Sequence, residues 1–298
     1  MKKIILLSIL VMGILTLTAQ VYKPYVLGAI SDMPLDETID SLKVSLLYNG
    51  LDISGEYMPA DNESRYVIIV SSPKLLEAIS AKGGSRAFAA AWRIGLTDVG
   101  NMLQISFMNP LYWGNAYFQD DFNAVWTELS EMNNKLVASM QIFGNNPMLE
   151  FGSKDGLKAK KLQKYHYMAM MPYFKDVVDI AEFESYEAAI SRLEKNFQRK
   201  DDLEQIYRID IPNNNLTLYG FGFSGEKGES LFLPKIDSGE PKHTAFLPYE
   251  FLVIDNKVVM LHGRYRIALS FPDLDMGTFM KIMSTPGNIA EAVESLTE

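Results

Sequence analysis

Three basic side chains alternate along the sequence LHGRYRIAL in the last quarter of the chain. On an extended strand this alternation places His262, Arg264 and Arg266 on one face and apolar side chains on the other. A row of cations on a sheet face would receive an anionic ligand or a carboxylate-bearing partner chain. The alternative is a solvated face whose charges pair with Glu250 or Asp255 on the neighbouring strand.

Aromatic side chains gather in the sequence NPLYWGNAYF, which begins at Asn109. Tyr112 and Trp113 lie there between a proline and a glycine, a composition typical of recognition loops because aromatic rings offer a large contact area with a polar tip. Packing as the lid of a core is the alternative. A similar stretch, FPDLDMGTFM, has Asp273 and Asp275 in place of the aromatics, so either one copy kept a site that the other lost or both line one groove.

The chain has three histidines, and the two outside the basic row are His166 and His243. His166 is flanked by tyrosines and would alternate with them on a strand, which makes it a candidate binding residue or part of a half-solvated face. His243 is expected in an exposed loop. Since no two histidines have the spacing of a metal-binding motif, we expect neither a metal site nor a cofactor.

Signatures of common enzymes are missing from the sequence. It contains no Gly-x-Ser-x-Gly element and no glycine-rich phosphate loop ending in Lys-Ser or Lys-Thr. The chain has no cysteine, which excludes disulfides, thiolate nucleophiles and thiolate metal ligands. A pair of catalytic carboxylates stays open, because its two members can lie anywhere in a chain. The sequence therefore leaves catalysis uncertain and favours a protein that is not an enzyme.

The first residues have the pattern of a secretory signal. Lys2 and Lys3 precede an apolar run over residues 4–17 that closes on the small-residue sequence TLTAQ. This run of about 14 residues is shorter than the roughly 20 that cross a bilayer as a helix. We therefore expect a signal peptide over residues 1–20 and export as a soluble protein to the periplasm or the external medium, with no stable membrane span after cleavage.

Charge argues against a nucleic-acid partner. Without Lys2 and Lys3, the 28 basic side chains fall to 26, against 37 acidic ones. Such an acidic chain repels polyphosphate at long range. Within it, the segment 141–164 concentrates lysines that would attract an anionic surface or ligand, or would form a solvated linker. These lysines are Lys154, Lys158, Lys160, Lys161 and Lys164.

The two halves of the chain repeat one pattern. Apolar residues in the stretch 35–46 recur at spacings of four, three and four, as on one face of a helix, and the stretch 186–197 repeats them 151 positions later. The stretches 103–118 and 264–280 match at an offset of 162, and of 163 after a one-residue insertion. Ordered matches predict an internal duplication, with chance similarity as the alternative. Four pairs match at an offset of 153: Pro59 with Pro212, Asn62 with Asn215, Tyr66 with Tyr219 and Ser71 with Ser224.

Each half is expected to form one α+β unit. A leading strand, over 22–30 or 164–174, precedes the helix, and then come two strands, a connection, a hairpin and a closing helix. The predicted fold class is therefore α+β, with two tandem related units that each have a mostly antiparallel sheet and helices packed on one face. The first unit covers 21–140, a basic linker 141–164, and the second unit 165–298.

This order of elements resembles the bacterial α+β domain-of-unknown-function family three-hundred-and-two. The residues that carry the resemblance are the helix PLDETIDSLKVSLLYNG and the closing stretch LPYEFLVIDNKVVMLHGRYRIALSFPDLDMG. The resemblance implies the fold, in two tandem divergent copies. It implies no activity and no catalytic residues, because that family has none assigned.

Together these patterns predict an exported binding module built by internal duplication, whose partner is a small ligand or an envelope protein. The alternative is an envelope hydrolase with a site between the units, in which Asp273 or Asp275 works with His262 or Arg264.

Overall fold

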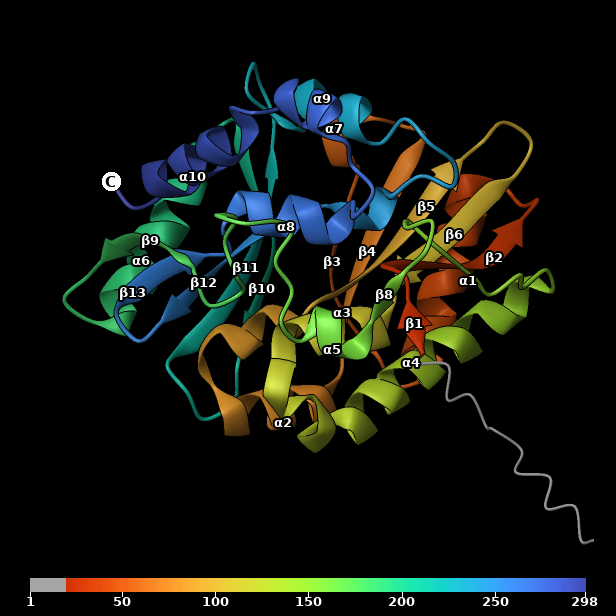
Figure 1. Cartoon of the computed structure of the whole chain (residues 1–298), viewed down its shortest axis with the longest axis horizontal. Coiled ribbons are helices and arrows are strands. Elements are labelled where there is room, and N and C mark those ends of the chain that lie inside the picture. The colour runs from red at the N-terminus through yellow and green to blue at the C-terminus, as the bar shows by residue number, and fades with distance from the viewer. Residues whose placement is uncertain (1–19) are drawn as a thin grey trace, which may run out of the picture.

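The computed structural model describes residues 20–298, and the fold is α+β with antiparallel sheets, as predicted (Figure 1). All but the last residue of the predicted signal peptide lies outside the described residues. Within residues 20–298, none of the helices combines the length and the hydropathy needed to span a bilayer.

The first half of the chain forms a six-stranded antiparallel sheet with the strand order β3-β4-β5-β6-β2-β7. Its strands are β2 (Tyr25–Ser31), β3 (Asp52–Tyr57), β4 (Arg65–Ser71), β5 (Trp92–Asp98), β6 (Leu103–Met108) and β7 (Leu149–Phe151). The helices of this half are α1 (Leu35–Tyr48), α2 (Pro73–Lys82), α3 (Pro110–Phe118) and α4 (Trp126–Met140), with short 3-10 turns at Pro59–Asp61, Gly84–Ala89, Gln119–Ala124 and Gln141–Phe143.

The second half forms a five-stranded antiparallel sheet with the order β10-β11-β12-β13-β9. Its strands are β9 (Val178–Glu182), β10 (Leu203–Asp210), β11 (Leu216–Phe223), β12 (Tyr249–Ile254) and β13 (Lys257–Met260). Its helices are α6 (Tyr186–Phe197), α7 (Glu229–Ile236), α8 (Gly263–Ser270), α9 (Met276–Met280) and α10 (Thr285–Ser295), with a 3-10 turn, η5, at Thr244–Phe246.

The two predicted amphipathic helices lie where the apolar spacing placed them. In α1 the buried stripe includes Ile39, Leu42 and Leu46, and the helix ends at Asn49 before Gly50, whose φ of 72° suits a glycine. Helix α6 begins after Ser185, whose side chain accepts a hydrogen bond from the backbone N–H of Ala188. Both helices therefore follow from local sequence.

Element order is the same in the two sheets. In each, the strand that follows the first helix lies at one edge, and its hairpin partners follow in chain order toward the leading strand. The predicted match between stretches 103–118 and 264–280 is wrong, however, because β6 is a strand whereas 264–270 belongs to helix α8. In the order of elements, β13 and α8 of the second half take the positions that β6 and α3 have in the first half.

The predicted leading strand of the second half is also wrong. Residues 164–174 form turns, and the leading strand is β9. His166 therefore does not alternate on a strand; its ring stacks on Tyr173 with a centroid separation of 4.6 Å. The sequence YHYMAMMPYF is rich in aromatic and methionine side chains, but it pairs with none of the described strands, so strand propensity was misleading there.

The basic segment 141–164 is partly built into the first half. It contains β7, which pairs with β2, and a short strand β8 (Leu157–Lys158), which pairs with β1 (Val21–Tyr22). A four-residue helix, α5 (Ala159–Leu162), follows. Pairing of β7 with β2 brings the start of the chain and its middle to one edge of the larger sheet.

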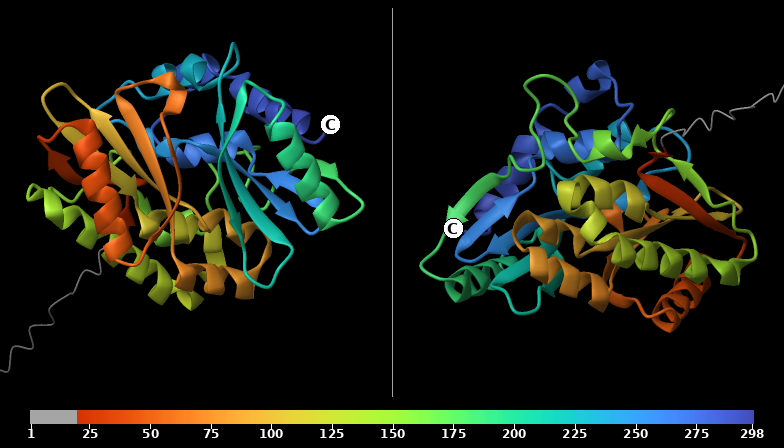
Figure 2. Two further views of the ribbon diagram at one scale, coloured as in Figure 1. Left: turned by 180° about the vertical axis from the view of Figure 1, so that it is seen from behind. Right: turned by 60° about the horizontal axis from the view of Figure 1, so that its bottom comes forward.

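Strands β3 and β10 meet where the two sheets abut. A Cβ added at Gly55 would lie 2.4 Å from the carbonyl oxygen of Ile206, closer than any real contact. Figure 2 (left) shows the orange strands of the first half and the teal strands of the second half side by side. Only glycine allows this approach of the two backbones.

The six-stranded sheet has a different neighbour on each face. On one face, α4 packs against β2 where Met140 meets Gly28, and α4 also contacts α1 through the serine pair Ser45 and Ser139. On the other face lie residues 237–246 of the second half. Alternate side chains of β5 contact this segment: Arg93 Nε donates to the Ala245 carbonyl at 3.0 Å, and the hydroxyls of Thr97 and Thr244 are 2.7 Å apart.

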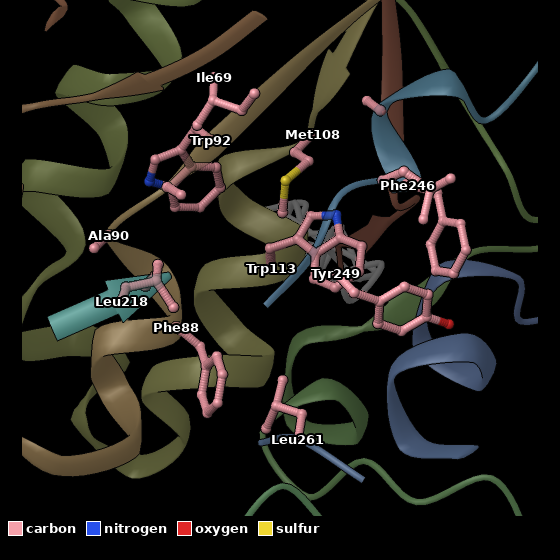
Figure 3. Close-up of a cluster of buried hydrophobic side chains, with 14 of the residues drawn as sticks. Ile69, Phe88, Ala90, Trp92, Met108, Trp113, Leu218, Phe246, Tyr249 and Leu261 are labelled. Carbon is pink, nitrogen blue, oxygen red and sulfur yellow. The ribbon is translucent and has the colours of Figure 1, made fainter. Parts of the chain in front are cut away.

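Helix α3 corrects the prediction of an aromatic recognition loop. The sequence NPLYWGNAYF forms this helix, with Asn109 as its N-cap, and Tyr112 and Trp113 are 0% and 1% exposed. Trp113 Nε1 donates to the Pro24 carbonyl, and Tyr112 donates to the Leu269 carbonyl. Because α3 is buried on all sides, its sequence lacks the period of an amphipathic helix. Figure 3 shows Trp113 in a cluster with side chains of both halves, among them Met108, Phe246 and Tyr249.

Helix α8 corrects the prediction of a cationic strand row. Strand β13 ends at Met260, and His262 caps the helix by accepting a hydrogen bond from the Arg264 backbone N–H at 3.2 Å. Arg264 is exposed whereas Arg266 is 1% exposed, so the two do not share a face. Seven of the eight residues of α8 are buried, and such a helix cannot be told from a strand by apolar spacing.

Arg266 belongs to a buried ion cluster between the halves. Its Nη2 lies 3.3 Å from Glu250 Oε2, and Arg93 Nη1 of the first half lies 2.7 Å from Oε1 of the same carboxylate. Tyr207 also donates to Glu250, at 2.6 Å. Glu250 therefore does pair with an arginine, as the alternative interpretation of the basic row expected, but in the core and not on a solvated face.

Candidate functional site

A cleft of about 560 Å³ lies between the two halves. The first half contributes Lys23 and residues 149–154, which β7 and its pairing with β2 hold in place. The second half contributes residues within 236–243, from the end of α7 onward, and within 271–278, from the end of α8 into α9. Ligand clefts of this volume commonly lie between structural units.

An aspartate–histidine pair lies at the inner wall of the cleft. His243 Nδ1 lies 2.8 Å from Asp237 Oδ1, and the His243 backbone N–H donates to the same oxygen at 2.9 Å. Asp237 Oδ2 forms an ion pair with Arg65 of β4, so the carboxylate is shared by both halves. His243 thus lies in a segment that the first half fixes in position.

The Asp237 carboxyl is held in its ionised form. Burial would raise the pKa of Asp237, but the hydrogen bonds and charge of His243 and the charge of Arg65 outweigh burial and hold this pKa below its usual value. An ionised Asp237 accepts a hydrogen bond from Nδ1–H of His243. In the neutral imidazole this leaves Nε2 of His243 with a lone pair that accepts a hydrogen bond.

Three aromatic rings surround His243. The centroid of its ring lies 5.1 Å from that of Tyr25, 5.6 Å from Phe151 and 4.5 Å from Phe271. Nε2 is buried without a hydrogen-bond partner among the described residues. It lies beside Gly152, where an added Cβ would be 3.0 Å from Nε2 and where φ is +91°. A buried polar atom without a partner is costly unless a ligand or water completes it.

Both aspartates that the sequence singled out lie at this cleft. Asp273 accepts a hydrogen bond from the Ser153 hydroxyl at 3.3 Å and another from the Lys154 backbone N–H. Asp275 caps α9 by accepting hydrogen bonds from Thr278. Those two hydrogen bonds lower the pKa of Asp275, which is fully exposed. FPDLDMGTFM, one of the two loops that were predicted to be equivalent, therefore borders a cleft.

The other candidate residues lie elsewhere. His262 and Arg264 line a separate opening of about 470 Å³ between β13, α8 and α10, where burial and the charge of Arg264 lower the pKa of His262. Tyr112, Trp113 and Arg266 are in the core, and His166 lines neither opening. The structure thus brings Asp273 and Asp275 together with a histidine, but that histidine is His243.

A second buried carboxylate, Glu229, joins the halves away from the cleft. Tyr57 and the Ala60 backbone N–H of the first half donate to it at 3.4 and 2.9 Å. Burial raises the pKa of Glu229 to about 8, because these hydrogen bonds only partly offset the loss of solvation. Among the described residues, no group of three or more histidine and carboxylate side chains is arranged to hold a metal ion.

Sequence analysis missed His243, Asp237 and the role of the loop at Gly152. Asp237 and His243 are six residues apart on an irregular segment, a spacing that no local motif marks. His243 was expected to be exposed, yet its side chain is 14% exposed because Tyr25 and Phe151 of the first half cover it. The environment of Asp237 and His243 is therefore formed only when segments that are distant in the sequence pack together. Lys154 was noted as part of the basic run, and it lines the cleft.

No family model, curated protein or solved structure matches this chain. The resemblance to domain-of-unknown-function family three-hundred-and-two therefore stays a prediction.

Proposed function

We propose that this protein is a binding module that takes a small ligand in the cleft between its two halves. The observation that carries the proposal is the unpartnered Nε2 of His243 at the wall of a cleft of about 560 Å³. Asp237 and Arg65 fix the imidazole, and aromatic rings enclose it. A fixed polar atom in an apolar surround is the usual means by which a pocket orients a small molecule.

Loop positions also support binding. The cleft is bordered by connections and by the end of the short strand β7, whereas the sheets and buried helices form a packed scaffold behind it. Binding residues are commonly held on loops by such a scaffold. The ion cluster of Arg93, Glu250 and Arg266 ties the two halves together and keeps the cleft walls at a set separation.

A thermal-shift screen tests this proposal. The wild-type protein is screened against metabolites, sugars, short peptides and metal ions, and each hit is repeated on His243→Gln. We expect a ligand that raises the melting temperature of the wild type and loses most of this effect in the variant, because binding to the folded state alone stabilises it.

His166→Gln is the matched control, since His166 lies outside the cleft and stacks on Tyr173. This variant should keep the wild-type response to every hit. Silence across the whole screen, or hits that His243→Gln leaves unchanged, would overturn the proposal.

Hydrolysis in the same cleft is a second candidate function, favoured by the Asp237–His243 pair. An imidazole held by a carboxylate through Nδ1 is suited to remove a proton from water or a hydroxyl through Nε2. Among the described residues no hydroxyl is hydrogen-bonded to Nε2, so the base would act on a bound water. Turnover of a panel of ester, amide and glycoside substrates, abolished in His243→Gln, would distinguish an enzyme from a binding module.

Internal duplication and export belong to the same proposal. The equal order of elements supports duplication, as do the polar N-caps Asn109 and His262 that begin α3 and α8. Under this proposal the cleft arose at the junction of two copies, with the segment 141–164 joining them. The basic and apolar start of the sequence supports export to the periplasm or the medium, where the partner would be a small ligand or an envelope protein.

A further inference from the structure

The charges at the cleft are not neutralised within the protein, and both signs are present. Lys23 and Lys154 line it, and among the described residues neither ammonium group has an ion-pair partner, whereas their backbone N–H groups donate to the carboxylates of Glu150 and Asp273. The lysines therefore leave positive charge available to a ligand.

Three carboxylates at the same cleft lack a cationic partner. Glu150 accepts a hydrogen bond from the Lys23 backbone N–H at 2.9 Å, and Asp273 and Asp275 accept only from neutral donors. Neutral donors satisfy the oxygen atoms but leave the negative charge in place. Glu240 differs, because Lys242 neutralises it at 3.1 Å.

An apolar pocket adjoins the charged cleft. Phe271 and Leu274 line both, so one wall is shared. The pocket has a volume of about 40 Å³, which admits a few carbon atoms and not a long chain. Its remaining lining is mostly apolar: Tyr167, Met171, Ile267, Ala268, Met276 and Phe279, with Arg264 as the single charged side chain.

We infer that the ligand is a zwitterion with a short apolar substituent, of the class of an apolar amino acid. Its carboxylate would pair with Lys23 or Lys154, its ammonium group with the carboxylates Asp273 and Glu150, and its side chain would enter the apolar pocket. This inference rests on the proposed function of the cleft. A ligand of this chemistry uses both unneutralised charges and the pocket beside them.

Four probes that differ by one group test the inference. Leucine has both charges and a branched side chain; glycine lacks the side chain, 4-methylpentanoate lacks the ammonium group, and 3-methylbutylamine lacks the carboxylate. By calorimetric titration, we expect leucine to bind at least about tenfold more tightly than each of the others. Glycine loses about fourfold for each buried methylene that it lacks, and each of the other two probes loses a pairing between a charged group and its partner.

Variants assign each group of the ligand to its partner. Lys154→Met, combined with Lys23→Met, should weaken leucine and 4-methylpentanoate at least about tenfold and leave the amine unchanged. Asp273→Asn should weaken leucine and the amine and leave 4-methylpentanoate unchanged. Lys158→Met is the control, because Lys158 is an exposed lysine of the same basic segment but lines neither the charged cleft nor the apolar pocket.

Equal binding of leucine and glycine, or of leucine and either singly charged probe, would overturn the inference. So would loss of leucine binding in Arg264→Met with full binding in the double lysine variant, since the carboxylate would then lie at the wrong end of the pocket. If leucine is silent while another ligand of the screen depends on His243, the inference fails and the proposed function stands. If no compound in the thermal-shift screen stabilises the protein, both the inference and the proposed function fail.

Discussion

His243 Nδ1 lies 2.8 Å from Asp237 Oδ1, and Arg65 of the other half forms an ion pair with the second oxygen of the same carboxylate. The aspartate is 2% exposed, and its partners come from a loop of the second half and a strand of the first. The contact therefore serves both the packing of the halves and the orientation of the imidazole at the cleft.

Asp237→Asn should destabilise the protein by about 3–5 kcal/mol, because it leaves the largely buried Arg65 without a counter-charge. In the wild type the pKa of Asp237 is depressed in the folded state, so its contribution is present above the ordinary aspartate value of 3.8 and is lost as pH falls through the lower folded-state value. Urea denaturation at neutral and acid pH measures both effects. A loss of less than about 1 kcal/mol would show that the pair is not formed.

Glu229 has the opposite pH dependence. Burial raises the pKa of Glu229 to about 8 from 4.5, so the folded state keeps a proton that the unfolded state has lost between these values. The free energy of unfolding should therefore fall as pH rises from about 4.5 to about 8, by on the order of 5 kcal/mol, and be level above that range.

Glu229→Gln removes this titration and keeps a polar group beside Tyr57 and Ala60. Its free energy of unfolding should vary less between about pH 5 and about pH 9 than that of the wild type. Glu226→Gln, at an exposed glutamate three residues earlier, is the control and should follow the wild-type curve. Parallel curves for all three proteins would contradict the burial argument.

Trp113→Ala should cost about 3–5 kcal/mol of stability, because the side chain is 1% exposed and its Nε1 donates to the Pro24 carbonyl. Trp126, 54% exposed, supplies a control of the same residue type, and Trp126→Ala should change stability by less than about 0.5 kcal/mol. Denaturation by urea, followed by far-UV circular dichroism, measures both. If both variants lost equally little stability, Trp113 would have to lie at the surface, as its sequence context suggested.

Elements with a one-sided apolar pattern could be predicted from the sequence. Helices α1 and α6 begin at Leu35 and Tyr186, the first positions of the predicted apolar stripes, because half of each helix faces solvent and the pattern records this. Helices α3 and α8 could not be predicted, since both are enclosed on nearly all sides and their sequences carry no period. Because these two helices are buried, neither the predicted aromatic recognition loop nor the predicted basic strand row is formed.

The candidate site was only partly predictable for a related reason. Asp273 and Asp275 were found because their loop stood out in the comparison of the two halves, although the alignment that led to them paired a strand with a helix. His243 and Asp237 have no such local mark. Their pairing depends on η5 crossing the face of the six-stranded sheet, where Thr244 meets Thr97. A site assembled by packing of distant segments leaves little trace in local spacing.

Gly55→Ala tests whether the close approach of β3 and β10 holds the halves together. The added methyl group would lie 2.4 Å from the Ile206 carbonyl oxygen, and backbone on both sides must move, so we expect a loss of about 1–3 kcal/mol. Gly287→Ala in α10 is the matched control, because nothing lies within 4 Å of its added methyl group and alanine favours a helix. That variant should be unchanged or slightly more stable. If Gly55→Ala also kept wild-type stability, the two sheets would have to be further apart in solution, and a cleft whose walls depend on their separation would lose its structural basis.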